Sequence, residues 1–140
     1  MIVDASVGVK WLVREPGSDV ALALLDTREL AAPDLLKLEV GHVLGKRLRR
    51  GQASMAFLTD AWRDLQAAEV RFEPFQDHLD EAFILALELG AAIYDCVYLA
   101  LAEAEDDVLV TSDERFVRAA RQCGDVAIAR RVRLLHEFAP

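Results

Sequence analysis

The feature that constrains this chain most is the regular alternation of short apolar segments with longer helical patterns. The apolar segments are rich in Val, Ile, Leu, Phe and Ala and have the length of strands; they span 1–4, 30–32, 70–75, 108–110 and 126–129. Short buried strands separated by helices are typical of a parallel sheet that is covered on both faces. The sequence therefore predicts an α/β fold with three α/β/α layers and a short, mainly parallel central sheet.

The helices between these strands are predicted from apolar spacing and from residues that favour helix ends. They cover 6–13, 18–26, 34–50, 54–67, 76–89, 94–105 and 113–122. Ser6 and Asp34 are expected to be N-caps, and Gly51 and Gly90 are expected to end helices. With 140 residues and no repeat or Pro/Ser-rich linker, residues 1–140 are predicted to form one domain.

The composition excludes a disordered chain and predicts a cytoplasmic one. Hydrophobic residues make up 54% of the sequence, yet no apolar run approaches the roughly 18 residues that a membrane span needs. Residues 1–4 lack the basic start and long apolar centre of a signal peptide. In the cytoplasm, Cys96 and Cys123 are expected to stay reduced.

Three aspartates stand at element boundaries, where two interpretations apply. Asp4 and Asp113 come just after strands, and Asp95 stands near the start of an apolar helix. Each alone is explained by a turn or a helix cap, because Asp is favoured there. Ligands of parallel α/β sheets bind at the carboxyl ends of the strands, so Asp4 and Asp113 are also expected together at one functional edge.

Glu39 is harder to explain as a surface residue. It lies three or four positions from apolar residues such as Leu35 and Val43, which places it beside the apolar face of its helix. A carboxylate in that position needs a compensating cation. Lys46 or Arg50 on the same helix could supply it as a salt bridge, and a shared metal ion is the other interpretation.

Taken together, the four acids predict a metal site. Like charges in one pocket raise each other's pKa unless a cation neutralises them. A ligand set made only of carboxylate oxygens suits Mg²⁺ or Mn²⁺ rather than zinc. Such ions lower the pKa of a water molecule and stabilise the leaving oxygen in phosphodiester cleavage. The predicted catalytic metal ligands are therefore Asp4, Glu39, Asp95 and Asp113.

Four segments match a known family in order and in spacing. They read IVDAS at 2–6, LEV at 38–40, YDCVYLALA at 94–102 and VTSD at 110–113. These segments resemble those of the PIN-domain nucleases, and the resemblance covers essentially the whole chain. The resemblance is greatest to the VapC toxins of bacterial toxin-antitoxin pairs.

The resemblance implies a PIN-like fold and a Mg²⁺- or Mn²⁺-dependent endoribonuclease that acts as a toxin. The four acids fall on the family's acidic positions, and Ser6 and Thr111 fall on positions that support the metal site by hydrogen bonds. Ser6 alone is equally explained as a helix cap. The resemblance further implies a homodimer, an RNA substrate and a small antitoxin that inserts a side chain near the acids. His42 stands where many relatives carry Asn, and a structural histidine is the favoured interpretation.

Two helices offer basic side chains near the predicted site. They matter because the net charge is −8, whereas binding to phosphates normally requires a basic surface. Lys46 and Arg50 continue the stripe that contains Glu39, and Arg115 and Arg118 share one face of the helix after Asp113. These four basic residues are predicted to contact RNA; the alternative is a merely solvated charged surface.

Three other functions are alternatives to a nuclease on the residues alone. A phosphatase with an Asp-x-Asp motif needs a second acid at position 6, where Ser6 stands. A phospho-accepting signalling module needs an early pair of adjacent acids and a Lys after a later strand, where Thr-Ser-Asp stands instead. A catalytically silent interaction protein of the same fold is the third alternative.

Overall fold

The computed structural model describes residues 1–139 and contains one sheet of five parallel strands. The strands are β1 (Ile2–Val3), β2 (Leu30–Pro33), β3 (Val70–Glu73), β4 (Leu109–Thr111) and β5 (Val132–Leu134), in the order β3-β2-β1-β4-β5. In the central register, Ile2 lies opposite Ala31 on one side and opposite Leu109 on the other. The predicted parallel α/β sheet is confirmed.

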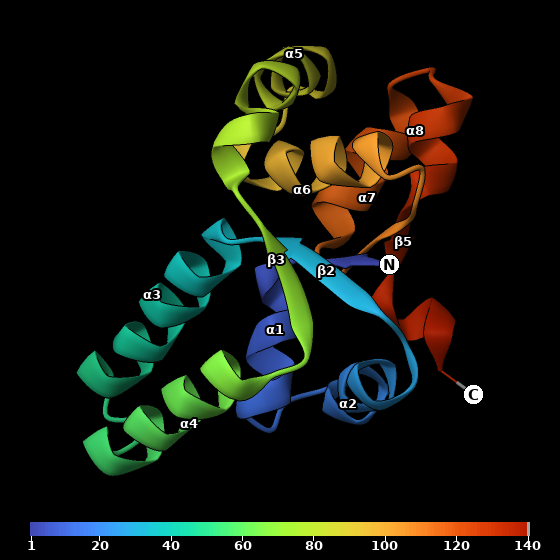
Figure 1. Ribbon diagram of the computed structural model, residues 1–140. Coiled ribbons are helices and arrows are strands. Elements are labelled where there is room, and N and C mark those ends of the chain that lie inside the picture. The colour runs from blue at the N-terminus through green and yellow to red at the C-terminus, as the bar shows by residue number, and fades with distance from the viewer. Residues whose placement is uncertain (140) are drawn as a thin grey trace.

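Helices cover both faces of the sheet (Figure 1). One layer contains α1 (Ala5–Leu12), α2 (Ser18–Thr27), α3 (Leu35–Arg49) and α4 (Met55–Ala67). The other contains α5 (Leu79–Leu89), α6 (Ile93–Ala104), α7 (Glu114–Gln122) and α8 (Val126–Arg131). Two short 3₁₀ helices, η1 (Phe75–His78) and η2 (Leu135–Phe138), precede α5 and follow β5. The predicted three-layer α/β/α arrangement is therefore present.

Burial explains why the central strands could be recognised as apolar runs. Every residue of β1, β2 and β4 is buried, whereas the edge strands β3 and β5 expose part of their residues. Helix α6 packs against all three central strands and is buried continuously from Cys96 to Ala102. This packing fixes the position of Asp95, which precedes the buried stretch by one residue.

The region after α7 differs from the prediction. A strand was expected at 126–129, but these residues belong to α8, because the carboxylate of Asp125 accepts hydrogen bonds from the amides of Ala127 and Ile128 and caps a helix. The last strand is β5, in which Val132 lies opposite Leu109 of β4. The prediction of a strand at 126–129 was wrong, because the last strand lies after α8 at Val132–Leu134.

Two predicted helix caps also differ. Helix α1 begins at Ala5 and is capped by Asp4, whose Oδ1 accepts from the amide of Val7 at 3.2 Å, so Ser6 is not the cap. Asp34 precedes α3, but its carboxylate accepts from the amide of Phe75 at 3.0 Å instead of capping the helix. The side chain of Asp34 thus joins the start of α3 to the first residue of η1, which follows β3.

Two expectations about composition can be compared with the fold. Cys96 is buried, Cys123 is half-buried, and both are free, as predicted. Within residues 1–139, no single helix has the length and apolar composition to cross a membrane; only the bent pair Phe75–Leu89 and Ile93–Ala104, with 116° between its halves, meets both criteria when taken together.

Candidate active site

A cavity of about 330 Å³ lies at the carboxyl edge of the sheet and is lined by acids from four parts of the chain. Asp4 follows β1, Glu39 lies on α3, Asp95 lies in the first turn of α6, and Asp113 precedes α7. Residues separated by up to about a hundred positions therefore meet in one cavity. We call this space the acid cavity.

Two of these acids also have the local role that the sequence allowed. Asp4 caps α1, and Asp113 caps α7 by accepting from the amides of Arg115 at 2.8 Å and Phe116 at 3.2 Å. Asp95 is different, because α6 begins at Ile93 and has no side-chain cap. The interpretation of Asp95 as a helix cap is thus wrong, which leaves its carboxylate free to face the cavity.

A hydrogen-bond network joins the ends of β1 and β4 around Asp4. The hydroxyl of Ser6 donates to Asp4 Oδ1 at 2.6 Å and accepts from the amide of Ser112 at 2.8 Å. The hydroxyl of Thr111 donates to Asp4 Oδ2 and accepts from the amide of Asp113 at 2.9 Å. Each carboxylate oxygen accepts about two hydrogen bonds, so Oδ1 is saturated while Oδ2 keeps one lone pair for a further ligand.

Glu39 has no cation beside it. Within residues 1–139, no Lys or Arg nitrogen lies within 4.0 Å of the Glu39 carboxylate, the limit for an ion pair. The predicted alternative of a salt bridge with Lys46 or Arg50 is therefore not formed. Oε1 of Glu39 is buried, and neither it nor the hydroxyl of Tyr98 makes a hydrogen bond of full geometry within residues 1–139. The hydroxyl of Tyr98 nevertheless lies close enough to lower the pKa of Glu39, so it partly compensates the buried carboxylate.

The acids raise each other's pKa. Burial, followed by the charges of Asp4 and Asp95, raises the pKa of Glu39 to about 7, and the nearby hydroxyl of Tyr98 only partly opposes this. Burial, followed by the charges of Asp113 and Asp4, raises the pKa of Asp95 to about 6. Burial also raises the pKa of Asp4. Perturbed carboxyls gathered in one cavity are typical of functional sites and attract a cation.

The donor set fits a hard divalent ion. All four acids offer oxygen, which Mg²⁺ and Mn²⁺ prefer. Within residues 1–139, no three Asp, Glu, His or Cys side chains are placed to coordinate one ion at the same time. This open arrangement suits Mg²⁺, which usually binds one or two carboxylates and keeps several waters until phosphate oxygens replace them.

Two cations line the same cavity and are held by one further acid. Lys10 Nζ lies 2.9 Å from Glu15 Oε1, and Arg47 Nη2 lies 2.6 Å from Glu15 Oε2. Both cationic side chains are mostly buried, at 11% and 25% exposure. Nε of Arg47 is buried without a hydrogen-bond partner in the described chain, so Arg47 keeps a donor for another group.

The turn before α2 fixes Glu15 in this position. Ser18 is 2% exposed, and its hydroxyl donates to the carbonyl of Val13 at 3.2 Å and accepts from the amide of Glu15 at 3.0 Å. The backbone of Glu15 is therefore held while its carboxylate reaches both cations. Hydrogen bonds and ion pairs therefore hold the Lys10–Glu15–Arg47 cluster in the cavity wall.

The other predicted contact residues lie outside the acid cavity. Lys46, Arg50, Arg115 and Arg118 are all exposed, and none of them lines the cavity. His42 is also exposed, and the interpretation of it as a structural histidine stays a prediction.

Four residues of this site were not among the predicted site residues, and three of them carried a signal. Arg47 follows Glu39 and Val43 at helical spacing, and Lys10 follows Ser6 by four positions. Tyr98 follows Asp95 by three. Glu15 had no such signal, because its place depends on a turn that brings it to Arg47, 32 residues away.

The PIN domain family model matches residues 1–122. "Ribonuclease VapC3" of Pyrobaculum aerophilum is 34% identical over 120 residues, covering 82% of this chain and 90% of that protein. "Ribonuclease VapC3" of Mycobacterium tuberculosis is 32% identical over 120 residues, covering 85% and 86%. A crystal structure of PAE2754 from Pyrobaculum aerophilum superposes with a TM-score of 0.66 at 28% identity, covering 84% of this chain and 77% of that one.

Proposed function

Because this chain belongs to the PIN-domain family, we propose that it is a metal-dependent endoribonuclease that acts as the toxin of a toxin-antitoxin pair. Nuclease activity is supported by its ribonuclease relatives. The observation that carries the proposal is the convergence of Asp4, Glu39, Asp95 and Asp113 on one cavity without a cation beside Glu39. The proposed catalytic unit is a single domain spanning residues 1–140.

One or two of the four acids would bind Mg²⁺ or Mn²⁺ directly and the others would face it through its waters, with Ser6 and Thr111 fixing Asp4. When bound, the ion supplies an activated water and stabilises charge on the phosphate. The protein's own contribution is to orient the carboxylates, since the hydroxyls of Ser6 and Thr111 leave Asp4 one free lone pair. The raised pKa values of Glu39 and Asp95 mean that an ion must displace protons near neutral pH.

Removal of divalent ions tests the proposal directly. Purified protein is expected to cleave single-stranded RNA in the presence of Mg²⁺ or Mn²⁺ and to stop when EDTA is added. Gel analysis of end-labelled RNA would measure both states, and added Mn²⁺ in excess should restore cleavage. Full cleavage in EDTA, or stable phosphorylation of Asp4 by a small phosphodonor, would contradict the proposal and favour the alternative functions.

Lys10 and Arg47 are proposed to bind the phosphate that is cut. Four acids alone would repel RNA, whereas two cations within the same cavity offset that charge locally. Glu15 orients both cations through its two carboxylate oxygens.

Exchange of Arg47→Met is expected to lower kcat/KM for RNA about tenfold or more, because a hydrogen bond to a charged group contributes about 1.5–3 kcal/mol. Lys10→Met should have a similar effect. The matched control is Arg63→Met on α4, an exposed arginine paired with Asp60 outside the cavity. Equal kinetics for the Arg47→Met and Arg63→Met proteins would remove Arg47 from the site.

The exposed Lys46, Arg50, Arg115 and Arg118 are proposed to attract RNA at longer range. Their contribution is expected to be mainly to association, and to weaken with added salt. They differ in this respect from the cations inside the cavity.

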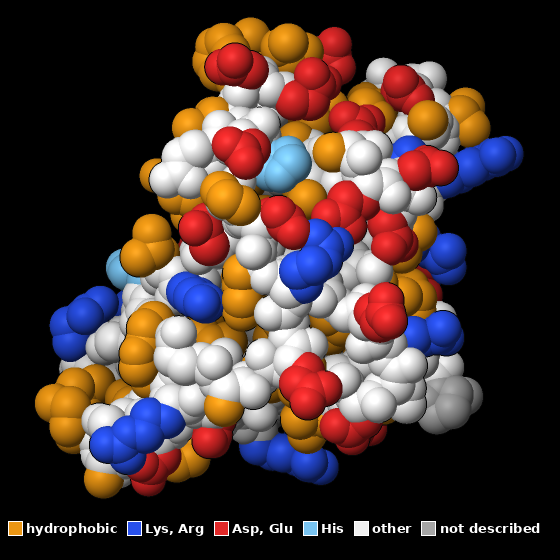
Figure 2. Space-filling view, in the orientation of Figure 1, with side chains coloured by type: hydrophobic (Ala, Val, Ile, Leu, Met, Phe, Trp, Pro, Cys, Tyr) orange, Lys and Arg blue, Asp and Glu red, His pale blue; other side chains and the backbone are white. Residues whose placement is uncertain are grey.

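A second copy of the chain and a small antitoxin are the proposed protein partners. Large apolar side chains are exposed on two surfaces, which supports such contacts. The first is on α5 and comprises Leu79, Phe83, Ile84 and Leu87; the second is on α4 and includes Met55 and Trp62. Figure 2 shows hydrophobic side chains gathered over both regions, at the top and at the lower left.

A further inference from the structure

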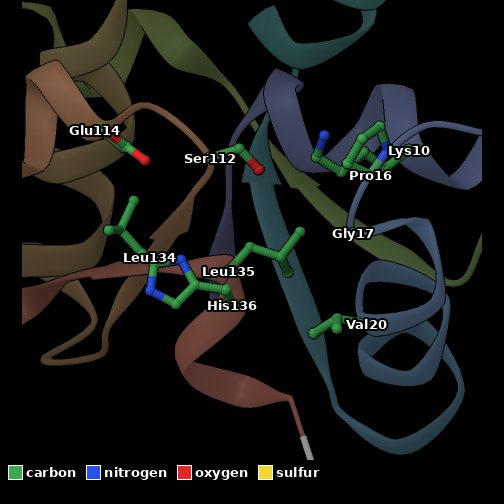
Figure 3. A pocket seen from close by; sticks show the side chains of 9 residues that line it. All are labelled: Lys10, Pro16, Gly17, Val20, Ser112, Glu114, Leu134, Leu135 and His136. Carbon is green, nitrogen blue, oxygen red and sulfur yellow. The ribbon is translucent and has the colours of Figure 1, made fainter.

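A second cavity adjoins the acid cavity on the side of Lys10. Its volume is about 370 Å³, within the range of about 300–1,000 Å³ that is usual for small-molecule sites. Figure 3 shows Lys10 and Val20 on one side of it, Leu134 and His136 on the other, and Ser112 between them. Lys10 lines this cavity and the acid cavity alike, so the two spaces meet at its side chain. We call it the His136 cavity.

A third cavity adjoins the acids on the opposite wall. It measures about 590 Å³ and shares Glu39, Val43 and Asp95 with the acid cavity. Its lining includes the ring of Tyr94, which is 60% exposed. We call it the Tyr94 cavity. The acid cavity therefore adjoins both of the others. His136 lines one outer cavity, and Tyr94 and His42 line the other.

Both outer cavities have an apolar wall with few polar groups. In the His136 cavity, Val20 and Leu135 supply apolar surface. Lys10 and His136 supply polar nitrogen, Glu114 supplies a carboxylate, and the hydroxyl of Ser112 has no hydrogen-bond partner in the described chain. A nucleobase has this same character, since its faces are apolar and its edge carries donors and acceptors. Bases of single-stranded RNA stack on Tyr and His side chains in proteins.

The backbone keeps the His136 cavity open. Gly17 has φ of +88°, a conformation that favours glycine. A Cβ atom at this position would lie 3.4 Å from Leu135 Cδ2 and 3.8 Å from Cδ of Lys10, so a larger side chain would fill the space between them. The turn that places Glu15 beside Lys10 thus also leaves room beside it.

We propose that the three cavities form one track for single-stranded RNA, in which the nucleosides on either side of the cut phosphate bind in the His136 and Tyr94 cavities. The proposal rests on the proposed ribonuclease function and deepens it. The cut phosphate lies in the middle, between the acids and Lys10. Bases must be unpaired to enter the outer cavities, so the track selects single strands over duplexes.

The test compares an oligoribonucleotide with the same strand made abasic on both sides of the cut. Val20→Trp fills the His136 cavity, and His136→Ala and Tyr94→Ala each remove a ring. Each change is expected to raise KM for the single-stranded oligoribonucleotide about tenfold, the order of one lost base stack. The abasic strand has no base to stack, so its cleavage should proceed at the same rate in these variants as in the wild type. Tyr94→Phe keeps the ring and should keep the wild-type KM.

A matched control is available on the same helix as Val20. Leu22→Trp adds an equal ring to α2 at a site outside the cavity. If the Val20→Trp protein does not fold, the two exposed positions His136 and Tyr94 decide the result. RNA kinetics equal to the control would overturn the track. If the wild type hydrolyses neither substrate, the proposed function fails together with it, a result distinct from loss of the track alone.

Discussion

Exchange of Asp95→Asn is expected to lower kcat/KM for RNA cleavage by more than about 100-fold while the fold is retained. Outer residues that only support metal ligands typically cost about 10–100-fold when changed, so a direct ligand should cost more. Asp95 is suited to this test because it makes no helix cap and its loss breaks no backbone hydrogen bond. Asp4 and Asp113, by contrast, cap α1 and α7, and their exchange would disturb the fold as well as the site.

The measurement is single-turnover cleavage of an end-labelled oligoribonucleotide at saturating Mn²⁺. Circular dichroism and thermal unfolding of the Asp95→Asn protein would establish that it is folded. Asp64→Asn, an exposed aspartate on α4, is the matched control and should cleave as the wild type does. A folded Asp95→Asn protein with activity within a factor of a few of the control would exclude Asp95 as a metal ligand.

The sheet could be predicted from the sequence because a strand that is buried at every residue consists of consecutive apolar residues. β1, β2 and β4 are buried at every residue, so they appear as short apolar runs. The same pattern of apolar residues gave a wrong strand prediction at 126–129, where an apolar segment follows Asp125. Whether such a segment becomes helix or strand depended on the cap at Asp125 and on the pairing of Val132 with Leu109, a contact distant in sequence.

The acids could be predicted for a related reason. Parallel strands place whatever follows them at one edge, so Asp4 and Asp113 were expected to meet. Glu39 and Arg47 occupy one stripe of α3, yet the role of Arg47 depends on Glu15, which reaches it through a turn held by Ser18. Ion pairs between distant segments leave no periodic pattern, so the Lys10–Glu15–Arg47 cluster could not be predicted, although Lys10 and Arg47 lie at helical spacing from Ser6 and Val43.

Metal-free protein is expected to lose stability as the pH rises from about 4 to 7. The pKa of Glu39 rises from 4.5 to about 7, and that of Asp95 from 3.8 to about 6, in the folded state. Between these values the folded state holds protons that the unfolded state has lost, so the free energy of unfolding falls with increasing pH. After allowance for solvent screening of these partly exposed groups, each contributes on the order of 1 kcal/mol.

Glu39→Gln removes one of the repelling charges and should flatten this pH dependence. At pH 8 without metal, the variant is expected to be more stable than the wild type by about 1 kcal/mol, since a neutral amide is not repelled by Asp4 and Asp95. Urea titrations at pH 5 and pH 8 would measure the difference. Glu69→Gln, an exposed glutamate between α4 and β3, should leave the wild-type pH dependence unchanged.

Mn²⁺ should reverse the order of stability at pH 8. Ligand at about 100 times its dissociation constant stabilises the folded state by roughly 2.7 kcal/mol, which for a domain of this size raises the Tm by about 5–10 °C. The wild type should show this rise and become more stable than the Glu39→Gln protein. In the wild type the ion neutralises the repulsion between Glu39 and its neighbours, whereas the variant has no charge at position 39 and gains less from the ion. An equal rise in both proteins would place the ion away from Glu39, and no rise in the wild type would contradict a metal site in the acid cavity.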